Sequence, residues 1–169
     1  MLFVQIALGQ KKTTPDLLIS FFDSTNHTYG FKSLHGKVVI PAGKYDLCFT
    51  DTFRTYAILL LPHVGFVGID RKEEILYTVF PFDNGPDYVQ DGLFRITKAG
   101  KIGYADAVTG KIVIQPQFAC AWPFKNGEAK VSMQCETKSL GEHSTWISNK
   151  WFYIDKKGRT VKGVRAQNK

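Results

Sequence analysis

The sequence lacks the local signatures that mark the common enzyme classes. It has no Gly-x-Ser-x-Gly phrase for a hydrolase nucleophile, no P-loop, and no glycine-rich phrase between a strand and a helix. No apolar run comes near the roughly 20 residues that a membrane-spanning helix needs, and the run at residues 57–61 is far shorter. These absences predict a protein that is not an enzyme, uses no cofactor and has no transmembrane span.

Cysteine is also scarce. The three cysteines, Cys48, Cys120 and Cys135, contain no Cys-x-x-Cys pair, and the four histidines are isolated from them in the sequence, so no zinc-binding pattern is present. Buried free thiols are the simplest interpretation of an odd number. If the protein is exported, Cys120 and Cys135 become candidates for a disulfide, although the sequence does not give the distance between them.

What the sequence has instead is a recurring phrase. Residues 103–114 place Val and Ile around a Thr-Gly pair, which is typical of a β-hairpin. Related phrases occupy residues 29–40, 66–76 and 151–161. Aromatic residues make up 14% of the chain, a high share, and the repetition explains it because each copy carries Phe and Tyr at matching positions. We expect most of these rings to form the core of the protein.

The copies recur at a nearly constant spacing. Aligned on Phe31, Gly68, Tyr104 and Tyr153, the first three are 36–37 residues apart, which indicates an array of repeated units. The last interval is longer by about a dozen residues, and we assign this insertion to the polar run 134–144.

Each hairpin follows another apolar segment, so one unit is predicted to be a three-stranded antiparallel β-meander. A proline after the third strand is expected to end it, and an aromatic-rich link is expected to cover the open face. The prolines are Pro41, Pro81 and Pro116, and the link aromatics are Tyr45, Phe82, Phe118 and Trp122. We therefore predict an all-β fold with little helix, in which the meanders form a stacked or propeller-like array. The single domain spans residues 10–164, with units at about 17–50, 54–90, 91–126 and 127–164.

Two residue types repeat at the hairpin turns. Asp70, Asp106 and Asp155 occupy the same place in three copies, which favours a role in the turn because a catalytic residue would occur once. Three glycines are expected to need positive φ. They are Gly36, Gly110 and Gly158.

The text KIGYADAVTGKIVIQPQFACAWPFKNGEAKV, followed later by KWFYIDKKGRTV, resembles the bacterial WG-repeat proteins. The resemblance covers about residues 28–162. The family is named for a Trp-Gly pair that opens the hairpin, and no copy here keeps that pair. In its place stand Tyr29-Gly30, Val67-Gly68, Ile102-Gly103 and Trp151-Phe152. The resemblance implies a binding or scaffold role in an exported or surface-associated bacterial protein, and it implies no known enzyme class.

The clearest candidate site lies beside the insertion, where Trp146 and Trp151 are close in sequence. This stretch loosely resembles the aromatic hairpins of cell-wall-binding repeats, because aromatic faces beside hydrogen-bonding groups suit sugars or cations such as choline. The alternative is that Trp151 belongs to the core, since it stands where the family's repeat Trp stands. The whole candidate surface for a ligand, a protein partner or a cell-envelope glycan is Trp122, Trp146, Trp151, Tyr153, Lys156, Lys157 and Arg159. An enzyme without a recognisable pattern stays open, and a deep pocket of polar groups with shifted pKa values would indicate one.

The two ends of the chain carry separate signals. Residues 1–9 are apolar and end in small residues, like the tail of a secretory signal peptide. We therefore expect export to the periplasm or cell envelope, the alternative being a first β-strand. Residues 150–169 hold seven basic residues against Asp155 alone, which predicts a solvated final turn and a basic tail at 165–169. Weak binding of an anionic partner through Lys156, Lys157 and Arg159 is the alternative. Specific nucleic-acid binding is not expected, because no recognition helix or stacked-aromatic sheet can be placed there.

Overall fold

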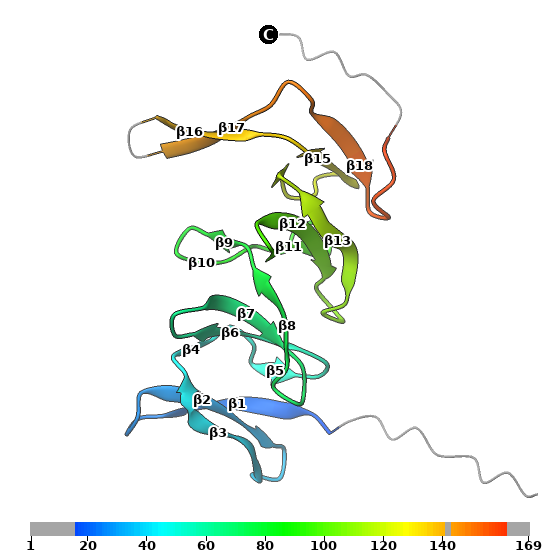
Figure 1. Ribbon diagram of the computed structural model, residues 1–169. Coiled ribbons are helices and arrows are strands. Elements are labelled where there is room, and N and C mark those ends of the chain that lie inside the picture. The colour runs from blue at the N-terminus through cyan, green and yellow to red at the C-terminus, as the bar shows by residue number, and fades with distance from the viewer. Residues whose placement is uncertain (1–15, 141–142, 162–169) are drawn as a thin grey trace, which may run out of the picture.

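The computed structural model describes residues 16–140 and 143–161, and every regular element in them is a β-strand (Figure 1). All strand pairs in these residues are antiparallel, which confirms the all-β prediction, and no sheet among them closes into a barrel. The same residues hold no helix long and apolar enough to cross a membrane. The signal-like residues 1–9 and the basic tail 165–169 lie outside the described residues.

The first sheet has the order β3-β2-β1-β5. Its strands are β1 (Leu18–Asp23), β2 (Thr28–Ser33), β3 (Val38–Tyr45) and β5 (Thr52–Phe53). Phe31 and Phe53 are buried in its core, and the same cluster continues into Leu59 and Val67 of the next sheet. Burial of these apolar side chains is the main favourable term for folding, so it joins the first two layers.

The second and third expected units share one sheet of seven strands, with the order β13-β12-β11-β8-β7-β6-β4. Its strands are β4 (Leu47–Cys48), β6 (Ala57–Leu61), β7 (Gly65–Ile69), β8 (Ile75–Val79), β11 (Leu93–Lys98), β12 (Lys101–Asp106) and β13 (Ile112–Phe118). Where the two units join, Val79 pairs with Ile96 and Thr78 with Thr97. The sequence predicted separate units side by side. The sequence did not predict this edge-to-edge join. Pairing with β11 provides hydrogen-bond partners for the backbone groups on the edge of β8, which would otherwise have none.

The C-terminal layer contains a three-stranded sheet of order β14-β15-β18 and the inserted hairpin. The strands here are β14 (Cys120–Ala121), β15 (Glu128–Ser132), β16 (Glu136–Leu140), β17 (His143–Ile147) and β18 (Phe152–Asp155). Another short pair, β9 (Pro81–Phe82) and β10 (Gly85–Pro86), lies between β8 and β11 in the chain. The layers follow one another in chain order from β1 to β18 (Figure 1).

The hairpin turns confirm the roles predicted for aspartate and glycine. Asp70, Asp106 and Asp155 each accept hydrogen bonds from two backbone N–H groups of their own turn, at 2.7–3.2 Å. The three turn glycines have positive φ: Gly36 (83°), Gly110 (70°) and Gly158 (77°). This left-handed conformation is open to glycine at little steric cost.

In two copies the glycine in the first strand of the hairpin lies against the backbone of the strand that pairs with it: Gly30 against β3 and Gly103 against β13. A Cβ on Gly103 would come within 2.5 Å of the backbone N of Pro116, and a Cβ on Gly30 within 2.7 Å of the backbone N of Ala42. The partner strands β3 and β13 shift their pairing register opposite these two glycines. In these two copies glycine is therefore required sterically, whichever residue precedes it.

The prediction that proline ends the third strand was wrong for two of the three copies. Pro41 and Pro116 lie inside β3 and β13, which continue to Tyr45 and Phe118. Both prolines stand where the strand bulges, so the ladder does not need the N–H that proline lacks. Pro81 does follow the end of β8, and it begins β9.

Candidate ligand-binding site

A groove lined by aromatic side chains lies between the β9–β10 hairpin and the inserted hairpin β16–β17. Its volume is about 310 Å³. We call it the aromatic groove, and its lining residues are Phe80, Pro81, Phe82, Asp83, Arg95, Trp122, Ser144, Thr145 and Trp146. The centroid of the Trp146 ring is 5.4 Å from that of Trp122 and 5.9 Å from that of Phe80. Both contacts are edge-to-face, a favourable arrangement for aromatic pairs.

The inserted hairpin is fixed at its base, and this places Trp146. A disulfide joins Cys120 in β14 to Cys135 just before β16, with the Cα atoms 6.1 Å apart. The hydroxyl of Ser132 lies 2.8 Å from that of Ser148, which also donates a hydrogen bond to the carbonyl of Gln134. The pairing of Cys120 with Cys135, which the sequence left open, is present in the structure, and Cys48 is a free thiol.

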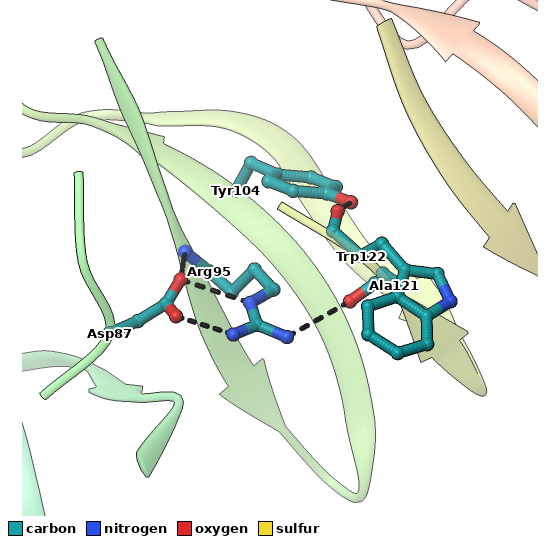
Figure 2. Close-up of polar contacts among 5 residues, drawn as sticks. All are labelled: Asp87, Arg95, Tyr104, Ala121 and Trp122. Carbon is teal, nitrogen blue, oxygen red and sulfur yellow. Dashed lines mark hydrogen bonds and ion pairs between the residues drawn. The ribbon is translucent and has the colours of Figure 1, made fainter. Parts of the chain in front are cut away.

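A buried ion pair lies beneath the groove (Figure 2). The Arg95 side chain donates hydrogen bonds to Asp87 from Nη2 at 2.5 Å and from Nε at 3.0 Å, and Nη1 reaches the carbonyl of Ala121 at 3.3 Å. Asp87 also accepts the backbone N–H of Arg95 at 2.8 Å. The two side chains are only 4% and 2% exposed. Such a pair is retained inside a protein when its hydrogen bonds are satisfied, as they are here.

The ion pair and its neighbour Tyr104 hold both sides of the aromatic groove. The Arg95 guanidinium carbon lies 4.1 Å from the centroid of the Phe80 ring, a cation–π contact. On the other side, the Tyr104 hydroxyl donates a 2.6 Å hydrogen bond to the carbonyl of Trp122 (Figure 2). Burial raises the pKa of the Tyr104 phenol well above its usual value, so the hydroxyl keeps its proton and continues to donate. The rings are thus presented on a fixed base.

A second groove, which we call the polar groove, has a volume of about 580 Å³. Its lining residues are Gln90, Trp122, Pro123, Lys125, Asn126, Glu128, Lys130 and Tyr153. Trp122 therefore lines both grooves, and its side chain is 42% exposed. The two grooves meet at this residue.

The structure brings some of the predicted site residues together and separates others. Trp122 and Trp146 are in contact in the aromatic groove, and Tyr153 joins Trp122 in the polar groove. Trp151 lines neither groove; its ring lies 5.1 Å from Nζ of Lys130. The partner of Trp146 is therefore Trp122 and not Trp151, because the inserted hairpin carries Trp146 back over β14.

The basic turn is solvated, as predicted: Lys156, Lys157 and Arg159 are all exposed, and two of them also have partners in the protein. Lys156 donates a 2.5 Å hydrogen bond to the carbonyl of Asp91. Arg159 forms an ion pair with Asp155, at 2.6 Å from Nη2, and the Arg159 side chain holds the pKa of that carboxyl below its usual range. Lys157 is exposed. Two of the three cations thus have partners within the turn or the neighbouring loop.

Sequence reasoning missed Phe80, Asp87 and Arg95 as parts of the site. Arg95 lies in the otherwise apolar stretch 92–96, and a charged residue inside an apolar strand is a signal of a buried partner. The identity of that partner depends on the loop between β10 and β11, which no local pattern predicts.

Among residues 16–140 and 143–161, no group of three or more His, Cys, Asp or Glu side chains is placed to hold a metal ion.

Comparison with known proteins identifies one repeat. Residues 102–133, which run from β12 into the bend after β15, match the family described as WG containing repeat. This match confirms the resemblance drawn from the same stretch, and it includes Gly103, Cys120 and Trp122. No curated protein matches the chain. No solved structure matches it.

Proposed function

We propose that the chain is a non-catalytic binding module of an exported bacterial protein, and that the two grooves meeting at Trp122 form its binding surface. The observation that carries the proposal is the exposure of large aromatic rings on a fixed base. Trp122 is 42% and Phe82 is 47% exposed, while the ion pair of Asp87 and Arg95 beneath them is almost fully buried. Exposed aromatic residues that are already held in place are typical of binding hot spots.

The non-catalytic part of the proposal is supported by the titratable groups with shifted pKa values, because each of them forms a hydrogen bond that stabilises the fold. Burial raises the pKa of Tyr56 and Tyr77, whose hydroxyls donate hydrogen bonds to the carbonyls of Ala107 and Gly110. These bonds tie β8, and the residue just before β6, to the hairpin turn after β12. The Thr109 side chain is the largest cause of the lowered pKa of Asp106, which holds that same turn. Each of these shifted groups already forms a hydrogen bond within the chain, so a structural role accounts for its shifted pKa.

Export is supported by the disulfide between Cys120 and Cys135, since such bonds persist in oxidising compartments such as the periplasm. It is also supported by the signal-like composition of residues 1–9 and by what the WG-repeat resemblance implies. N-terminal sequencing of protein from native cells tests it: a start at or near Gln10 is expected, and an intact Met1 in the cytosolic fraction would contradict it.

The binding role is tested with immobilised protein and a bacterial cell-envelope extract separated into protein and polysaccharide fractions. We expect the wild type to retain a component that the double variant Phe82→Ala, Trp122→Ala does not retain. Phe22→Ala is the matched control, because Phe22 is an aromatic residue 51% exposed in β1, in the layer at the other end of the described chain. Retention that is equal in all three proteins, or a retained component whose mass changes on incubation, would contradict the proposal.

A further inference from the structure

The side chains around Trp122 combine flat apolar surfaces with groups that bind hydroxyls. In the aromatic groove the exposed rings of Phe82 and Trp122 lie near the carboxylate of Asp83 and the hydroxyls of Ser144 and Thr145. Sugar rings present apolar C–H faces and a rim of hydroxyl groups, so they need a ring face and a hydrogen-bonding group at the same place.

The polar groove continues this chemistry on the other side of Trp122. Gln90, Asn126 and Glu128 supply planar amide and carboxylate groups, and Tyr153 supplies a phenol. Within the described part of the chain, no intramolecular hydrogen bond uses the side chains of Gln90, Asn126 or Tyr153. Their hydrogen-bonding capacity is directed to solvent, so a ligand can replace water there at small cost.

The charges around the grooves are mixed. Arg95 is neutralised by Asp87 beneath the aromatic groove. In the polar groove Lys125 and Lys130 stand beside Glu128. Electrostatic complementarity for a strongly acidic or strongly basic ligand requires a surface of one sign, and these grooves do not have one. The mixture favours a ligand that is recognised by shape and hydrogen bonds.

From these observations we infer that the two grooves bind a neutral oligosaccharide segment, with one sugar ring stacked on Trp122 and its neighbours in the aromatic and polar grooves. The volumes of about 310 and 580 Å³ match those of small-molecule sites and are small for a folded partner. This inference rests on the proposed function, since it names the ligand class of the same surface.

The test uses affinity electrophoresis in native gels that contain one soluble polysaccharide each: glycol chitin, hydroxyethyl cellulose or mixed-linkage glucan. Purified peptidoglycan sacculi serve as a fourth probe in a sedimentation assay. We expect retardation by at least one probe, with an affinity reduced about tenfold or more in Trp122→Ala, the effect of removing a central aromatic contact. Gln90→Ala tests the polar groove separately, at a residue whose φ is not positive, and should weaken binding without abolishing it.

Two controls make the result decisive. Phe22→Ala should bind as the wild type does, since Phe22 lies in β1 and lines neither groove. The melting temperature of Trp122→Ala must stay near that of the wild type; if it falls, the conservative Trp122→Phe is used, and we expect it to keep part of the binding.

Three outcomes would overturn the inference. If no probe is bound while Trp122-dependent retention of an envelope protein persists, the ligand is a protein: the module stands and the sugar inference fails. If a polysaccharide is bound equally by the wild type and by folded Trp122→Ala, the site is elsewhere. Absence of binding in both the polysaccharide and the envelope assays would overturn the inference and the proposed function together.

Discussion

The buried pair of Asp87 and Arg95 gives the sharpest prediction about stability. Asp87→Ala would leave the Arg95 guanidinium, now 4% exposed, without the carboxylate that accepts two of its hydrogen bonds. Removing one partner of a buried ion pair costs about 3–5 kcal/mol, because the other charge stays buried without compensation. Since a domain is stabilised by only about 5–15 kcal/mol in total, a large share of the folding free energy would be lost.

The double variant separates desolvation from packing. Replacing both residues, as in Asp87→Leu with Arg95→Met, removes both charges and keeps apolar volume. Replacing a buried pair by apolar residues is often close to neutral, so we expect the double variant to be more stable than Asp87→Ala alone. The free energies of unfolding of the wild type, the single variants Asp87→Leu and Arg95→Met, and the double variant, measured by urea titration, give the coupling energy, and we expect about 2 kcal/mol or more.

An exposed ion pair in the same chain provides the control. Arg159 and Asp155 lie at a similar distance, but the Arg159 side chain is 72% exposed, and such exposed pairs contribute little to stability. Arg159→Ala should therefore change the free energy of unfolding little. If Asp87→Ala costs no more than Arg159→Ala, or if the double variant loses the sum of the single effects, the reasoning about the buried pair is refuted.

Three further predictions concern the backbone, the disulfide and a turn. Gly103→Ala should destabilise the protein by about 1–3 kcal/mol, because the alanine Cβ would meet the backbone of β13. An unchanged urea midpoint would contradict this close approach of the two strands. Reducing the bond between Cys120 and Cys135, which are 15 residues apart, should lower the free energy of unfolding by about 3 kcal/mol. It should also loosen Trp146, seen as a shift in tryptophan fluorescence. If neither the free energy nor the fluorescence changes, the disulfide does not fix the inserted hairpin. The folded-state pKa of Asp106 is lowered, so its contribution is present above the unfolded pKa of about 3.9 and is lost as the pH falls further. Asp106→Asn should lack that acid-dependent part, and identical pH profiles of unfolding would argue against it.

The sequence predicted the fold where repetition made the signal strong. Gly36, Gly110 and Gly158 recur after a short polar turn, and the positive φ that they share follows from hairpin geometry alone. The aspartates of three turns were assigned correctly for the same reason. Local geometry of this kind depends only on neighbouring residues.

Features that depend on distant residues were not predictable in the same way. The usual rule predicts that a strand ends at Pro116. The strand continues because Pro116 lies in a bulge opposite Gly103, and only the close approach of β12 and β13 shows why proline is tolerated there. The contact of Trp122 with Trp146 depends on an inserted hairpin and a disulfide. The candidate site is therefore assembled from a repeat and an insertion, and the sequence indicated its aromatic residues without their correct partners.

The central claim is that a ligand binds where the two grooves meet, at Trp122. The chain has three tryptophans, so a ¹⁵N-labelled sample gives three indole N–H resonances, which Trp→Phe variants assign. On titration with a fragment of the polysaccharide or envelope component that the wild type retains, we predict that the Trp122 resonance shifts most and Trp146 next, while that of Trp151 stays. A shift confined to Trp151, or no shift in any of the three at saturating ligand, would contradict the account.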